Sequence, residues 1–159
     1  MDQIGPSSVI DRPWDLAVPD VRSHSSQPAV LLVRDPEKNN DYLESVCEFL
    51  EICVHHATTG DDLRTILSTL RPMAIIADLD GEIQDGFHVM KMAADHDRSM
   101  PILLLTGYDP ALLGAIDAVQ EVWGLTRVAT AADTAGVGAL VDFICHAARD
   151  AGKPRMLRA

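Results

Sequence analysis

Two aspartates and a threonine lie where short apolar runs of the sequence end. Asp35, Asp78 and Thr106 each stand within two residues of such an end. Two carboxylates at close range repel each other unless a cation lies between them, and Mg²⁺ is often held by one or two carboxylates together with phosphate oxygens. A carboxylate can also attack a phosphoryl group and form an aspartyl phosphate. These residues therefore favour an acidic, phosphate-handling pocket in which Asp78 is the candidate acceptor.

The elements that must position these residues are predicted by hydrophobic periodicity. Short apolar runs indicate five strands, three of them continuous enough to be buried on both faces. The expected strands are 29–33, 52–57, 73–77, 101–105 and 125–129. Apolar residues at helical spacing alternate with them, and the expected helices end near 50, 70, 94, 122 and 148. Asp35 followed by Pro36 is also the pattern of a helix N-cap, a role compatible with metal binding.

Strands that alternate with helices five times predict a parallel sheet covered on both faces by right-handed crossovers. The expected fold is a flavodoxin-like (βα)5 doubly wound sheet with strand order 2-1-3-4-5. In that order the first, third and fourth strands are neighbours. Because function gathers at the carboxyl ends of such strands, Asp35, Asp78 and Thr106 are expected to converge on one pocket.

Composition limits the class of protein. The chain has 159 residues, 47% of them hydrophobic, and a formal net charge of −11. One globular domain, 29–149, is expected between a flexible, proline- and serine-rich extension, 1–28, and a tail, 150–159. The acidic balance disfavours nucleic acid as a partner and favours a basic protein. No signal peptide or membrane-length apolar run is seen, and three cysteines without a CxxC pair favour free thiols and a cytoplasmic protein.

Three segments carry a resemblance to a known family. They are AVLLVRDPEKN, RPMAIIADLDGEIQDG and MPILLLTGYDP, with Asp78 six residues after Pro72 and eight before Gly86. Over 29–149 the chain resembles the CheY-like receiver domain of bacterial response regulators, which implies a non-enzymatic protein of two-component or phosphorelay signalling. The resemblance implies that Asp78 accepts the phosphoryl group and that Thr106 hydrogen-bonds it. It also implies that Asp35, Asp78 and the backbone carbonyl of Asp80 hold Mg²⁺. The implied partners are a histidine kinase or phosphotransfer protein and a downstream protein.

Two departures from the family pattern bear most directly on the chemistry of the pocket. The first of two adjacent acids is replaced by Arg34, whose guanidinium either pairs with Asp78 and displaces Mg²⁺ or points away. The family's lysine is expected near 129–131, where no lysine stands, and Arg127 is the nearest base. Two hypotheses follow: a stand-alone receiver phosphorylated on Asp78, or a degenerate pseudo-receiver that acts as a phosphorylation-independent interaction module.

An enzymatic alternative is more remote. The run Asp78-Leu79-Asp80-Gly81 resembles the first motif of haloacid-dehalogenase-type phosphatases, in which Asp78 would be the nucleophile and Asp80 the acid/base. Such enzymes carry this motif near the start of their domain and need a later lysine. Only Lys153, in the tail, follows Lys91.

Overall fold

The computed structural model describes residues 27–35, 37–38, 41–58, 61–79, 85–107, 109–132 and 136–151. Nearly all of the predicted N-terminal extension and most of the predicted tail lie outside these residues. No helix in the described ranges is long and apolar enough to cross a membrane.

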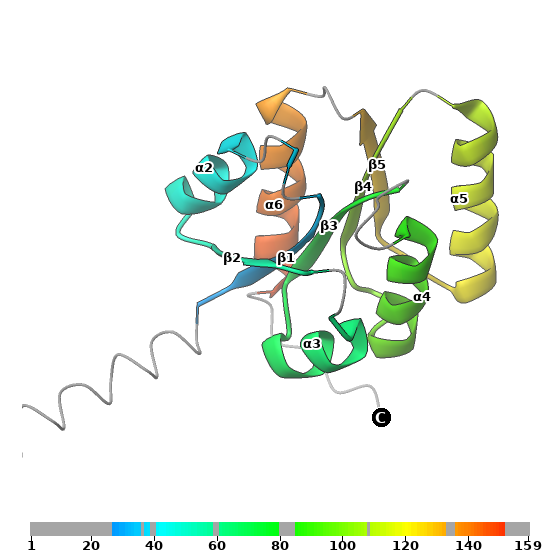
Figure 1. The fold of residues 1–159 in the computed structure, drawn as a ribbon, viewed down its shortest axis with the longest axis horizontal. Coiled ribbons are helices and arrows are strands. Elements are labelled where there is room, and N and C mark those ends of the chain that lie inside the picture. The colour runs from blue at the N-terminus through cyan, green and yellow to red at the C-terminus, as the bar shows by residue number, and fades with distance from the viewer. Residues whose placement is uncertain are drawn as a thin grey trace, which may run out of the picture.

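The centre of the molecule is a five-stranded parallel sheet with the order β2-β1-β3-β4-β5 (Figure 1). The predicted flavodoxin-like topology is therefore confirmed. The strands are β1 (Ala29–Val33), β2 (Cys53–His56), β3 (Ala74–Asp78), β4 (Ile102–Thr106) and β5 (Val128–Ala132). The inner strands β1, β3 and β4 are buried along their whole length, whereas the edge strands β2 and β5 are partly exposed.

Helices cover both faces of the sheet (Figure 1). They are α2 (Asp41–Phe49), α3 (Leu63–Leu70), α4 (Gly86–His96), α5 (Pro110–Trp123) and α6 (Val137–Ala151). Helices α2 and α6 pack on one face, and α3, α4 and α5 pack on the other. Successive strand residues point to opposite faces, so Leu31 and Ile75 enter one core while Leu32 and Ile76 enter the other. Each fully buried aliphatic side chain contributes roughly 1.5–3 kcal/mol of hydrophobic stabilisation.

Aspartates fix the start of three helices. The side chains of Asp62, Asp85 and Asp109 accept hydrogen bonds from backbone N–H groups in the first turns of α3, α4 and α5, at 3.0, 2.8 and 3.0 Å. These caps satisfy backbone donors that have no partner within the helix. Hydrogen bonds from the Thr65 hydroxyl and the Arg64 N–H lower the pKa of Asp62.

The predicted cap at Asp35 is wrong for α2, because that helix begins only at Asp41. Asp35 instead forms a turn of its own. Its carboxylate Oδ1 accepts the Glu37 N–H at 2.9 Å, and its carbonyl accepts the Lys38 N–H at 3.1 Å. Short aspartate side chains commonly bond to the backbone two residues on and stabilise such turns. This turn sets the path of the loop that carries Lys38.

The fifth strand was predicted three residues too early. The Leu125 N–H bonds to the carbonyl of Gln120 and so belongs to the end of α5, and the Thr126 N–H bonds to the carbonyl of Arg98. The sheet register begins only with Ile102 opposite Val128. At the other end of the chain, α6 continues to Ala151, two residues past the predicted domain end.

Gly86 stands where backbone approaches backbone. Its N–H donates to the Leu79 carbonyl at 3.0 Å, closing the segment after β3. A Cβ at this position would lie 2.6 Å from the Leu79 Cα and 2.9 Å from the Leu79 carbonyl oxygen. No side chain can be added there without moving main chain.

We therefore expect Gly86→Ala to lower the free energy of unfolding by about 1–3 kcal/mol, the usual cost of overpacking. Gly114→Ala is the matched control, because it lies in α5 with nothing within 4 Å of the added Cβ. That helical substitution should raise stability by about 0.5–1 kcal/mol. Urea denaturation measures both, and equal effects at the two positions would contradict the packing argument.

The two thiols Cys47 and Cys53 should differ in reactivity. Burial, and secondarily the charge of Glu44, raises the pKa of the Cys47 thiol, whereas Cys53 is exposed. Near neutral pH we expect alkylation of Cys53 in the native protein and of Cys47 only after unfolding. As the pH rises above the ordinary thiol range, the unfolded state loses the Cys47 proton first, so stability should fall. This fall in stability at alkaline pH should be absent in Cys47→Ala. Rapid alkylation of Cys47 in the native protein would contradict the burial of its thiol.

Candidate functional site

Asp78 is the last residue of β3 and is only 1% exposed. Its strand lies between β1 and β4, with Ala77 opposite Val33 and Asp78 opposite Leu105. The residues that follow β1 and the residue that ends β4 therefore lie at the same edge of the sheet as its carboxylate. A carboxylate this deeply buried must be paired or hydrogen-bonded, because desolvation of an isolated charge is costly.

Arg34 supplies the first partner of Asp78. It directly follows β1, is 4% exposed, and places its Nε 3.1 Å from Oδ1 of Asp78. The sequence left open whether this guanidinium pairs with Asp78 or points away from it. In the structure it pairs with Asp78. A buried pair of this kind is held by a charge-assisted hydrogen bond, here between two neighbouring strands.

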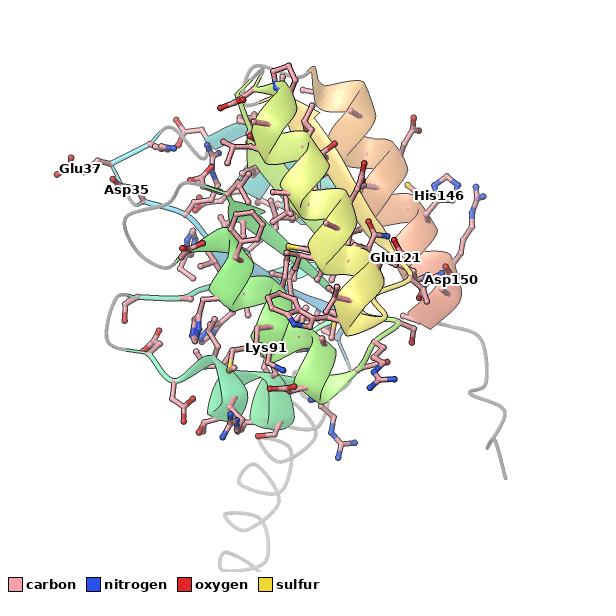
Figure 2. The ribbon with its side chains drawn as sticks, turned by 90° about the vertical axis from the view of Figure 1, so that its right-hand side faces the viewer. Asp35, Glu37, Lys91, Glu121, His146 and Asp150 are labelled. Carbon is pink, nitrogen blue, oxygen red and sulfur yellow. The ribbon has the colours of Figure 1, made fainter. Side chains whose placement is uncertain are left out.

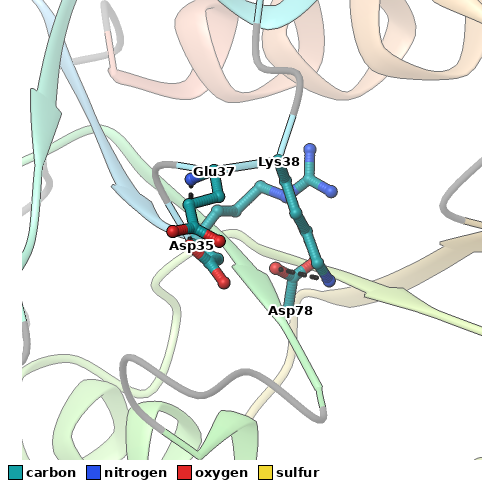
Figure 3. A network of polar contacts seen from close by, with 5 residues as sticks. Asp35, Glu37, Lys38 and Asp78 are labelled. Carbon is teal, nitrogen blue, oxygen red and sulfur yellow. Dashed lines mark hydrogen bonds and ion pairs between the residues drawn. The ribbon is translucent and has the colours of Figure 1, made fainter.

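Lys38 supplies a second cation, from the loop between β1 and α2. Its Nζ lies 3.2 Å from Oδ2 of Asp78 (Figure 3), and its side chain is 39% exposed. Oδ2 has no hydrogen-bond partner among the described residues, so this contact is an ion pair without hydrogen-bond geometry. Lys38 was not among the predicted site residues. No periodicity marks a loop lysine, and its position depends on the turn that begins at Asp35.

Asp35 lies beside this pair but on a different part of the loop. It is half-buried, and its Oδ1 is occupied by the Glu37 N–H (Figure 3). Its predicted role as a metal ligand thus competes with a structural role in the turn.

Thr106 ends β4 on the same edge of the sheet. It is buried, and its hydroxyl donates to the carbonyl of Gly107 at 3.2 Å. An added Cβ at Gly107, the next residue, would meet no atom within 4 Å, so there is open space at that position. The predicted convergence of Thr106 and Asp78 at one edge agrees with the strand register, in which Leu105 faces Asp78.

Strand β5 contains no basic residue that could reach this edge of the sheet. The strand residue opposite Thr106 is Ala132. Arg127, the nearest base in the sequence, precedes the strand at its other end, where it forms an ion pair with Asp150. The cations at Asp78 come from the loop after β1 instead.

The described residues contain no group of three histidine, cysteine, aspartate or glutamate side chains that could hold a metal ion. Both oxygens of Asp78 face a cation, which a divalent ion would have to displace. The predicted ligand Asp80 and, with it, Gly81 of the phosphatase-like motif lie outside the described residues.

Comparison with known proteins identifies the fold. No protein-family model and no curated protein matches the chain. Several solved structures, however, have a similar fold. A candidate Luxo repressor protein from Vibrio parahaemolyticus has a signal receiver domain with a TM-score of 0.62 at 20% identity, covering 79% of this chain and 92% of that one. A response regulator receiver protein from Sinorhizobium medicae has a TM-score of 0.62 at 15% identity, with coverages of 78% and 96%.

A CheY-like receiver domain protein from Methanospirillum hungatei is similar to the same extent, with a TM-score of 0.62, 17% identity and coverages of 79% and 96%. The likeness thus spans the sheet and its helices and nearly the whole of these receiver domains. This chain therefore has the CheY-like receiver fold, as the resemblance of its sequence segments implied.

Removal of Arg34 should destabilise the fold. Truncating one partner of a buried ion pair typically costs about 3–5 kcal/mol, and Arg34→Met should approach the lower limit because Lys38 remains near Asp78. The double variant Arg34→Met/Asp78→Asn should recover most of the loss, since no unpaired carboxylate is left. Exposed Arg64→Met is the control. Urea denaturation gives the coupling energy, and additive effects of the two substitutions would contradict the pair.

Proposed function

We propose that this chain is a receiver-type signalling module that works by protein–protein contact and does not depend on phosphorylation. The observation that carries the proposal is the buried ion pair between Arg34 and Asp78, with Nε 3.1 Å from Oδ1. In this proposal the guanidinium and the Lys38 ammonium take the place that Mg²⁺ has in a phosphate-accepting receiver. The partner is another protein, and the net charge of −11 favours a basic surface on it.

Charge supports this proposal in two ways. Two unit charges 4 Å apart interact by about 4 kcal/mol at an effective dielectric constant near 20, and a divalent cation next to a guanidinium feels roughly twice that repulsion. Mg²⁺ binding is therefore opposed by Arg34 and Lys38 together. The same two cations engage the carboxylate oxygens that a nucleophile must offer to phosphorus.

The second candidate is a stand-alone receiver that accepts a phosphoryl group on Asp78 from a histidine kinase or phosphotransfer protein. The buried Thr106 and the open space at Gly107 favour it, because both suit a phosphoryl group at the end of β3. Lys38, at 3.2 Å from Oδ2, would then neutralise phosphate charge in place of the missing lysine after β5. This candidate requires Arg34 to leave Asp78.

Incubation with acetyl phosphate and Mg²⁺, read by intact-protein mass, distinguishes the two. We expect no phosphoryl adduct on the wild-type chain. Arg34→Asp places a second acid beside Asp35 and removes the guanidinium, so this variant should bind Mg²⁺ and form an adduct that disappears in Arg34→Asp/Asp78→Ala. The exposed Arg64→Asp is the matched control and should behave as wild type. An adduct on the wild-type chain that is lost in Asp78→Ala would establish the second candidate and overturn the first.

A further inference from the structure

A cleft separates β5 from α6 at the edge of the sheet. Its volume is about 370 Å³, and its walls include Leu103, Ala131, Phe143 and Ala147. Figure 2 shows His146 and Asp150, two further lining residues, on the opposite side of the molecule from Asp35 and Glu37. The cleft is therefore distinct from the site around Asp78.

Small residues create this cleft. On β1, β3 and β4 the side chains that face α2 and α6 include Val30, Leu32, Ile76, Leu103 and Leu105. The register places Ala129 next to Leu103 and Ala131 next to Leu105 on that same face. Alanines also stand on the α6 wall. Because neither wall carries a large aliphatic side chain at these positions, the two elements leave apolar surface open where an aromatic side chain can enter.

The chain itself contains a segment of the required chemistry. We propose that the N-terminal residues 9–16 dock in this cleft, with Trp14 as the anchor. This segment, VIDRPWDL, combines Trp14 with the three aliphatic side chains of Val9, Ile10 and Leu16. It carries one cation, Arg12, and two aspartates. An indole stacked on the half-buried Phe143 would gain about 0.5–1.5 kcal/mol beyond its area burial. Arg12 would meet the exposed Asp142 on the rim.

The length of chain before β1 permits the contact. β1 starts at Ala29 on the amino edge of the sheet, and Pro101 and Arg127, which precede β4 and β5 on that edge, line the cleft. Three strand spacings separate β1 from β5, roughly 14 Å in all. The 13 residue-to-residue steps from Trp14 to Gln27 span up to roughly 43 Å when the chain is extended. A tether of this length raises the effective concentration of the segment to the millimolar range, which favours it over a partner in dilute solution.

Docking here would cover the face between β5 and α6 until another protein displaced the segment. This holds whether or not Asp78 accepts phosphate, so the inference stands apart from the proposed function.

Fluorescence of Trp14 in the full chain tests the proposal. Trp123→Phe leaves Trp14 as the only tryptophan and keeps an aromatic ring under Lys91, which lies 5.7 Å from the Trp123 ring centre. We expect the emission of Trp14 to be blue-shifted and its quenching by iodide to be several-fold weaker than in a peptide of residues 1–26. Emission and quenching equal to those of the peptide would overturn the proposal.

Cleft-filling variants locate the contact. In the Trp123→Phe background, Ala131→Leu should return the emission and quenching of Trp14 to the peptide values. Ala132→Leu, on the other face of the same strand and outside the lining of the cleft, should leave them unchanged. Ala139→Leu, on the exposed start of α6, is a second filling variant should Ala131→Leu prevent folding as judged by circular dichroism. Protection that persists in the filled variants, or that depends on protein concentration as binding to a second copy would, refutes docking within one chain.

Discussion

The ion pair between Arg34 and Asp78 is the interaction on which the centre of this structure depends. A carboxylate at 1% exposure is tolerable only with a partner, and the guanidinium comes from the adjacent strand end. The pair can form only because β1 and β3 are parallel neighbours that end at the same edge. Arg34 is better suited than lysine to this buried position, because its planar, weakly hydrated guanidinium offers several donors in a fixed geometry.

The receiver-like features of the sequence have two different physical origins. Gly86 is required by the close approach of its backbone to Leu79, and the apolar strands are required by burial between two helix layers. These features follow from the fold alone. The receiver pattern also has an acid at the position of Arg34 and a lysine after β5, and the packing of the fold requires neither. Both are absent from this chain. The fold can therefore persist while the phosphate chemistry of the site changes.

Much of the fold follows from the sequence because continuous apolar runs between polar segments leave few arrangements other than a parallel sheet. The errors fall where local hydrogen bonds override periodicity. Leu125 lies in an apolar run that resembles a strand, but its N–H bonds to a carbonyl at the end of α5. Asp35 precedes a proline as a helix cap would, but its carboxylate closes a turn. The pairing of Arg34 was undecided because a long side chain has several directions open to it. Lys38 was missed because only the conformation of the turn brings it to Asp78.

The unequal burial of the strands separates the two sites of interest. The central strands are buried on both faces, so a charge at their ends must be satisfied internally, as Asp78 is by Arg34 and Lys38. The edge strand β5 carries alanines toward α6 and is covered less completely, so apolar surface stays accessible there. In the proposed function the two cations keep the charge of Asp78 neutralised, and such a carboxylate changes state only when a competing ion or a phosphoryl group displaces them. The docking proposed for residues 9–16 would instead make the cleft between β5 and α6 respond to the segment that occupies it. If both proposals hold, regulation depends on occupancy of this cleft and not on chemistry at Asp78.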